Sequence, residues 1–172
     1  RKAVVAMGFQ EIFGHILTDK SSLIGAETAI ELENYMSETY SAVRNSILPQ
    51  LIDVLSKNKH AEYPQRIFEE GIIASRAGNA ISETHSLTMM SAHAKADFTE
   101  QKQHLNALLS SAGVQFTIQP AKHHAFLNGR AGMIMIGKKS VGVMGEISPA
   151  ILSKFGIEMP VAAAEIDLSF LI

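Results

Sequence analysis

Two apolar runs on either side of a tight polar corner constrain the fold of this chain more than any other feature. Residues Arg130–Ile136 and Val141–Ile147 flank the corner Gly137-Lys138-Lys139-Ser140. Strand-forming runs joined by a short turn that contains glycine are typical of a β-hairpin. This hairpin predicts that at least part of the chain is an antiparallel sheet.

Further segments extend the predicted sheet. The runs Arg66–Ala74 and His85–Ala92 are separated by a polar stretch from Arg76 to Glu83, which we expect to be a turn between two strands. Apolar and polar residues alternate from Val114 to Gln119, the period of a strand with one solvated face. The other expected strands are Phe9–Leu17, Ala29–Glu33 and Val161–Leu168.

Helices are predicted between the strands by their capping residues. Ser46 precedes an apolar stripe made of Ile47, Leu48, Leu51, Ile52 and Leu55. Asp97 and Glu100 form an aspartate variant of the capping box, which predicts a helix from Phe98 to Ala112. The two remaining expected helices are the end of one at Lys2–Met7, stopped by Gly8, and a short one that starts at Ser148-Pro149 and closes at Gly156.

The 172 residues, of which 47% are hydrophobic, suffice for one domain with a substantial core. There is no internal repeat, low-complexity tract or linker, so we expect a single α+β domain over residues 1–172. Because the chain starts at Arg1 without methionine, we expect it to be a fragment of a longer polypeptide.

Charge and composition exclude several classes of function. The 15 basic and 17 acidic residues nearly cancel, so no overall positive field favours nucleic acid, and any RNA contact has to be local. No stretch approaches the roughly 20 apolar residues of a membrane-spanning helix, so no membrane partner is expected. The absence of cysteine favours a cytoplasmic location and excludes thiolate zinc sites.

Residues Gly132 to Ser140 read GMIMIGKKS, one residue away from a phosphate-binding loop. Such a loop needs small residues whose N–H groups surround the phosphates, followed by a helix. Here the intervening residues are strand formers, Lys139 takes the place of the hydroxyl residue, and a strand follows. The hairpin is therefore the better interpretation, with both lysines in solvent at its tip.

The other chemistry-bearing residues each have a simpler explanation. The adjacent His123 and His124 point to opposite faces of an extended chain and lack a third ligand at metal-binding spacing. The pair Glu69-Glu70 and the stretch Glu83-Thr84-His85 are candidates for acid–base chemistry, but solvation of an exposed face also explains them. Four methionines, Met89, Met90, Met133 and Met135, are expected to fill the core.

A resemblance to a known family gives more information about function than these local patterns do. The stretches RKAVVAMGFQEIFGHILTD, IELENYMSETYSAVRNSILPQLIDVLSKNKHAEYPQRIFEEG and FLNGRAGMIMIGKKSVGVMGEISPAILSKFGIEMPVAAAEIDL together resemble the catalytic-like domain of the phenylalanyl-tRNA synthetase beta subunit over nearly the whole chain. The resemblance implies a class II aminoacyl-tRNA synthetase-like antiparallel sheet flanked by helices. It also implies a subunit that is similar to the catalytic one but performs no chemistry.

The three class II motifs test that implication. The first motif, which builds a subunit interface, resembles Arg1 to His15, with Gly8, Phe9 and Glu11 in place. The second needs an arginine that clamps the ATP α-phosphate and a carboxylate two residues later. The matching Ser75-Arg76-Ala77-Gly78 has no acid after Arg76, and the aligned position is either Arg76 or Ser75.

The third motif requires an arginine over the γ-phosphate, but the aligned segment Ala163–Leu168 contains Glu165 and Asp167 instead. Arg130 is the last arginine in the chain. We therefore expect the domain to be catalytically degenerate and to bind no cofactor or metal itself, while the holoenzyme uses ATP and magnesium.

The resemblance also implies partners. These are the alpha subunit, a second beta chain in an assembly of two alpha and two beta chains, and tRNA through the holoenzyme. We expect Phe9, Glu11, Phe13 and Arg44 to contact a partner subunit, with plain core or surface positions as the alternative. Two other functions stay open: an independently active adenylate-forming ligase, and a stand-alone interaction module with a different partner.

Overall fold

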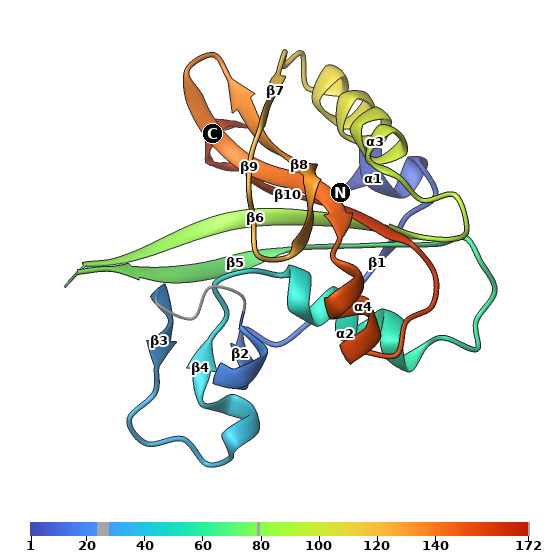
Figure 1. The fold of residues 1–172 in the computed structure, drawn as a ribbon. Coiled ribbons are helices and arrows are strands. Elements are labelled where there is room, and N and C mark those ends of the chain that lie inside the picture. The colour runs from blue at the N-terminus through green and yellow to red at the C-terminus, as the bar shows by residue number, and fades with distance from the viewer. Residues whose placement is uncertain (24–27, 79, 172) are drawn as a thin grey trace.

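A seven-stranded sheet forms the centre of the molecule (Figure 1). The computed structural model describes residues 1–23, 28–78 and 80–171. Only the first pair of neighbouring strands is parallel; the others are antiparallel. In spatial order the strands are β1 (Gln10–Glu11), β5 (Gln65–Ala77), β6 (Ala80–Ala92), β10 (Val161–Asp167), β9 (Lys139–Ile147), β8 (Phe126–Ile136) and β7 (Thr117–Pro120).

Helices cover both faces of this sheet. Helices α1 (Lys2–Ala6) and α3 (Phe98–Ser111) lie on one face, and α2 (Leu48–Lys57) and α4 (Pro149–Lys154) lie on the other (Figure 1). Each face has its own apolar core, one centred on α3 and one on α2. The expected α+β architecture, a sheet flanked by helices, is confirmed.

A small three-stranded sheet lies below the α2 face in Figure 1. It consists of β2 (Leu17–Thr18), β4 (Ala42–Val43) and β3 (Ile30–Glu31), joined by the 3-10 helices Lys20–Ser22 and Glu38–Tyr40. A last 3-10 helix spans Ser169–Leu171. Within the described ranges, no helix combines the length and the apolar character that a membrane crossing requires.

Helices α1 to α4 lie in the four predicted places, although the N-cap residue of α2 is Ile47 rather than the expected Ser46. Asp97 Oδ1 accepts a hydrogen bond from the backbone N–H of Glu100 at 2.7 Å, which starts α3 one residue later. Ser46 Oγ accepts from the N–H of Leu48 at 3.1 Å and satisfies a donor at the start of α2. All five residues of the apolar stripe are buried, so the α2 prediction is confirmed.

The β8–β9 hairpin is confirmed, with Met135 opposite Ser140 and Ile136 opposite Lys139. The phosphate-loop alternative fails because Gly132 to Ile136 belong to strand β8 and no helix follows. Lys138 is exposed at the tip, as expected, and Lys139 begins β9.

Three of the expected boundaries are wrong. Phe9–Leu17 is not a continuous strand, because only Gln10–Glu11 and Leu17–Thr18 are strand residues. The stretch Arg76–Glu83 is not a loop, because β5 and β6 stay paired to Ala77 and Ala80. Cross-strand pairing lengthens these strands despite their polar sequence. The strand expected at Val114–Gln119 starts at Thr117.

Candidate functional site

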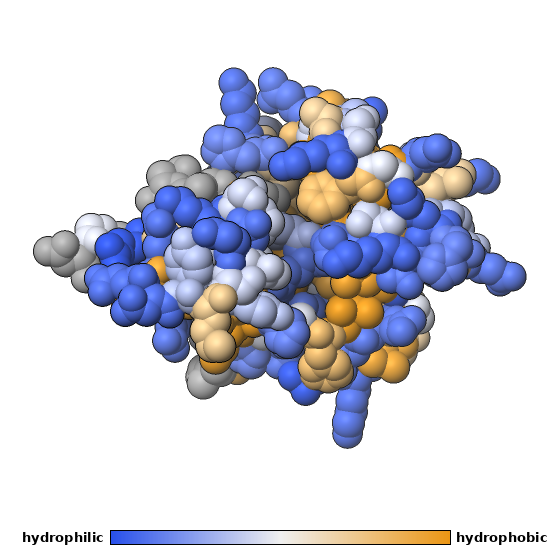
Figure 2. Space-filling view, turned by 90° about the horizontal axis from the view of Figure 1, so that it is seen from below, coloured by the Kyte–Doolittle hydropathy of each residue, from blue (hydrophilic) through white to orange (hydrophobic). Residues whose placement is uncertain are grey.

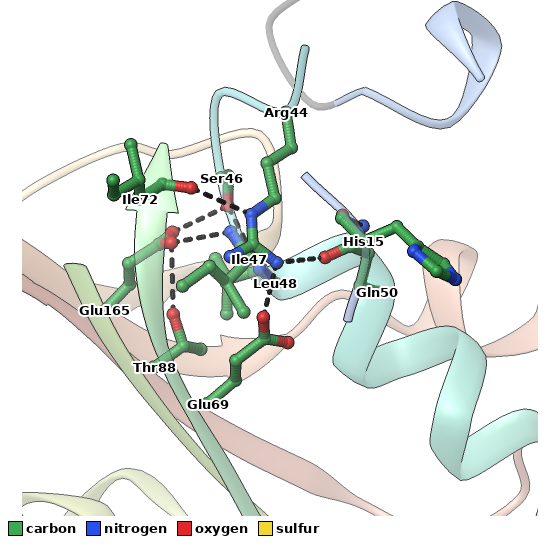
Figure 3. Close-up of polar contacts among 10 residues, drawn as sticks. All are labelled: His15, Arg44, Ser46, Ile47, Leu48, Gln50, Glu69, Ile72, Thr88 and Glu165. Carbon is green, nitrogen blue, oxygen red and sulfur yellow. Dashed lines mark hydrogen bonds and ion pairs between the residues drawn. The ribbon is translucent and has the colours of Figure 1, made fainter. Parts of the chain in front are cut away.

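A buried polar cluster lies on the α2 face of the large sheet (Figure 3). Its first half is the ion pair between Arg44, which follows β4, and Glu69 on β5, at 2.5 Å from Nη1 to Oε1. Both side chains are only 4% exposed. The guanidinium also donates to the carbonyl of Ile72 at 3.0 Å and to Gln50 Oε1 at 2.5 Å. Arg44 is thus neutralised and committed to partners within the chain.

The second half of the cluster is Glu165, at the centre of the sheet on β10. Its Oε2 accepts from Ser46 Oγ at 2.6 Å, and its Oε1 accepts from the backbone N–H of Ile47 at 2.7 Å and from Thr88 Oγ1 at 3.0 Å (Figure 3). Burial raises the pKa of Glu165 above its ordinary value, although the three donors and the Arg44 charge act in the opposite direction. The contacts tie the start of α2 to the last strand.

The cluster is closely packed. A Cβ on Gly71 would overlap Nη2 of Arg44, and a Cβ on Gly14 would lie 2.8 Å from Gln50 Oε1 and from Glu69 Oε2. Glycine at these two positions leaves the space that the Arg44–Glu69 pair occupies. Within the described residues, Glu69 Oε2 is one of the buried atoms that lack a hydrogen-bond partner.

The arrangement determines what the cluster can do chemically. A phosphate-binding site needs a cation or N–H groups that face an open space. Here the guanidinium faces the Glu69 carboxylate, and the backbone N–H of Ile47 donates to the Glu165 carboxylate. No group of three or more metal-ligating side chains exists in the ranges that the structure describes. The cluster is therefore suited to holding the β4–α2 segment against the sheet.

The four residues predicted at a subunit interface do not share one surface. Phe9 is 3% exposed and its ring lies edge-on to His104 at 4.9 Å, and Arg44 is buried in the cluster. Glu11 pairs with Arg1 at 3.1 Å. Phe13 is 77% exposed, so among the four it offers the most surface to a partner. The interface role of these residues remains a prediction.

The structure also places the candidate acid–base residues. Glu69 is not a solvated surface residue as the simpler interpretation expected, because it points inward to Arg44. Glu70 points to the other side and lies 3.2 Å from both Arg1 and His85. The rings of His123 and His124 are 6.4 Å apart, and the His123 ring packs on Phe126 at 5.1 Å.

The positions aligned with the two ATP-binding motifs lie on different strands, β5 and β10. Arg76 is exposed near the end of the β5–β6 hairpin, opposite Ile81. Glu165 occupies the third-motif segment and is buried among hydroxyl and N–H donors. Sequence reasoning missed the cluster itself. One usable signal was a carboxylate, Glu165, between alanines and isoleucine in an otherwise apolar strand.

Comparison with known proteins gives the family. Residues 1–168 match the family model described as the phenylalanyl tRNA synthetase beta chain CLM domain. The chain belongs to this family. The match confirms the resemblance that the three quoted stretches indicated.

Several archaeal relatives are similar to this beta-chain domain. Phenylalanine–tRNA ligase beta subunits from Thermococcus sibiricus and Methanocella arvoryzae are 42% and 37% identical to it, over 98% and 99% of the chain. The chain spans only 31% and 33% of their lengths, about a third of each. It therefore corresponds to one part of such a subunit.

A solved structure shares the fold. The pyrrolysyl tRNA synthetase PylSc of Desulfitobacterium hafniense superposes with a TM-score of 0.78 over 99% of this chain and 64% of its own. The sequences are only 16% identical, so the likeness concerns the fold alone. A synthetase-type sheet is thus established for this beta-chain domain.

Proposed function

We propose that this domain is the non-catalytic core of the beta subunit of a cytoplasmic phenylalanine–tRNA ligase. It supports the alpha subunit, which uses ATP and magnesium to charge tRNA with phenylalanine. Membership of the beta-chain family supports the proposal, and so does the similarity to curated beta subunits over nearly the whole chain.

One observation carries the non-catalytic role. The α2 face of the sheet presents the Arg44–Glu69 pair and the buried Glu165 carboxylate, and both acids would repel a nucleotide phosphate. The described arginine nearest the second motif, Arg76, lies exposed toward the end of a hairpin. An electrostatic clamp on the triphosphate is the dominant requirement of nucleotidyl transfer, and these groups do not provide it.

The contact with the alpha subunit is assigned to the surface next to the first motif. Phe13 and Ile16 are 77% and 43% exposed on the segment between β1 and β2, and Tyr40 is 40% exposed beside them. A hollow of about 430 Å³ between this segment and α2 includes His15 and Phe155. Figure 2 shows this side of the molecule from below, with apolar patches between charged side chains. Exposed aromatic residues beside a hollow are typical anchors of a protein interface.

The assembly follows from this role. In a class II dimer each subunit buries its first-motif helix and strand against the other, and here the beta chain takes the place of one active subunit. Two such alpha–beta pairs, each with its own beta chain, form the expected assembly of two alpha and two beta chains.

Size-exclusion chromatography with light scattering tests the proposal. The full-length beta chain is mixed with the alpha chain of the same organism, and a joint mass of two alpha and two beta chains is expected. Separate elution of two folded chains would contradict the proposal and favour an interaction module with a different partner. Titration of the beta chain alone with Mg-ATP is expected to show no saturable heat, whereas an independently active ligase would bind it.

A further inference from the structure

Strand β8 contains an excursion that the proposed function does not use. Phe126 pairs with Ile147 and Ala131 pairs with Gly145, so residues 127–130 stand opposite the single residue Glu146 of β9. Gly129 has a φ of +82°, a conformation that favours glycine and permits this bulge. Leu127 and Arg130 are exposed on it. Bulges are often found where a strand presents side chains to a ligand.

A hollow of about 310 Å³ lies between this bulge and the β7–β8 connection. None of the described residues that line it is acidic, although the whole chain carries a formal charge of −2. Its polar side chains are those of Lys122, His123, His124 and Asn128. All four side chains donate hydrogen bonds in at least one protonation state or tautomer. The ammonium group of lysine and the amide group of asparagine are suitable donors to phosphate oxygens.

A second cation lies next to the hollow. The N–H of Ala121 donates to the carbonyl of Ala131 at 3.3 Å, which continues the β7–β8 pairing. Lys122 follows this contact just after the end of β7, and Arg130 precedes it on β8. The Arg130 side chain is 61% exposed, and its guanidinium lies 3.5 Å from Glu146. This long, exposed ion pair leaves donors of Arg130 available on the side away from Glu146.

The hollow also offers ring faces. His123 packs on Phe126 at 5.1 Å, and the exposed His124 ring lies beside it at 6.4 Å. Burial and the neighbouring His124 lower the pKa of His123, which favours the neutral form of this ring. Unpaired RNA bases stack on histidine and aromatic rings, whereas an acidic peptide makes no use of such faces.

We propose that this basic hollow, lined by Lys122, His123, His124 and Asn128, binds the phosphate backbone and a base of a single-stranded RNA segment, with Arg130 on the adjoining bulge as a second cation. Its volume is at the lower end of the roughly 300–1,000 Å³ of ligand sites, which suits one nucleotide unit. The proposal rests on the proposed function for the identity of the RNA, which is an unpaired region of the tRNA bound by the holoenzyme. It adds to that function a contact site within this domain.

The test uses the complex of full-length alpha and beta chains and a fluorescently labelled phenylalanine tRNA transcript. The Kd is measured across a series of salt concentrations for the wild type and for Lys122→Ala/Arg130→Ala. We expect the double variant to bind about 5- to 100-fold more weakly and to lower the slope of log K against log salt by about 1 to 2, because each lost phosphate contact removes about one unit. Lys122→Arg is expected to retain most of the affinity.

Lys138→Ala is the matched control. Consecutive connections of an antiparallel meander lie at opposite ends, so the β7–β8 connection and the β8–β9 turn lie at opposite ends of β8 (Figure 1). Lys138 is an exposed lysine in that turn and does not line the hollow. An unchanged Kd and salt slope in the double variant would overturn the proposal. So would a loss of binding to the alpha chain with tRNA affinity retained, which would make the hollow a protein contact. Failure of the wild-type chains to associate would instead contradict the proposed function, and the same titration on the beta chain alone would still test the hollow.

Discussion

Arg44 and Glu69 form an ion pair of 2.5 Å in which both side chains are 4% exposed, and it joins the segment after β4 to strand β5. Removal of one partner from such a pair leaves an uncompensated buried charge. The buried cluster, the exposed Arg76 and the exposed Phe13 each lead to a testable prediction.

Arg44→Met is expected to lower the free energy of unfolding by about 3–5 kcal/mol, because the buried Glu69 carboxyl loses its ion-pair partner. The double variant Arg44→Met/Glu69→Leu is expected to recover most of this loss. Urea unfolding followed by circular dichroism measures both. The control is Lys57→Ala, which breaks the exposed pair with Asp53 and is expected to cost no more than about 0.5 kcal/mol. An equal, small effect for Arg44→Met and Lys57→Ala would show that the buried pair is not required.

The buried Glu165 predicts a pH dependence of stability. Its pKa is raised in the folded state, so its contribution to stability is fully present below the ordinary carboxyl value and is lost as pH rises through the folded pKa. Glu165→Gln removes this titration. The unfolding free energy of the variant minus that of the wild type is therefore expected to increase as pH rises from about 4.5. Urea unfolding of both proteins at several pH values gives this difference in unfolding free energy. A difference that does not change with pH would contradict the raised pKa of Glu165.

Arg76→Ala tests the proposal that this domain contributes no ATP site. Because Arg76 is exposed near the end of a hairpin, its loss is expected to leave the kcat of tRNA charging and the KM for ATP within about twofold of the wild type. The measurement is aminoacylation by the complete alpha–beta complex. A fall of about 100-fold or more in kcat, the size expected for an electrostatic catalytic group, would show that this arginine acts on the nucleotide.

Phe13→Ala tests the proposed surface for the alpha chain. An exposed aromatic anchor that becomes buried on association typically contributes about 2 kcal/mol, so we expect roughly 30-fold weaker binding to the alpha chain. Because Phe13 is 77% exposed in this domain, the fold of the variant should be unchanged. Isothermal titration calorimetry gives the affinities. Met36→Ala is the control, since Met36 is fully exposed and is not assigned to the interface. Equal affinities for both variants would place the interface elsewhere.

The sequence predicted local features well because their causes are local. The capping contact of Asp97 with Glu100 and the stripe of α2 depend on residues within a few positions of each other, and so does the β8–β9 turn. The family could be predicted because long stretches keep their order and spacing. These features together indicated the sheet and the helices that flank it.

The buried cluster could not be predicted because its partners are distant in the chain. Glu69 and Glu70 look alike in the sequence, yet alternation along β5 sends one to Arg44 and the other to Arg1. Only the pairing of β5 with its neighbours decides which of them is buried. The position of Phe9 could not be predicted for the same reason. A phenylalanine suits either an interface or a core, and in the structure it lies in the core beside α3.

The hydrogen bond from Ser46 to Glu165 joins residues 119 positions apart, and β10 lies between β6 and β9. During synthesis on a ribosome, the strand that closes the centre of the sheet is therefore the last to emerge. Until it does, β6 and β9 each expose an unpaired edge that another nascent chain can extend. The order of the strands thus leaves the incomplete domain open to pairing with other chains until β10 is in place.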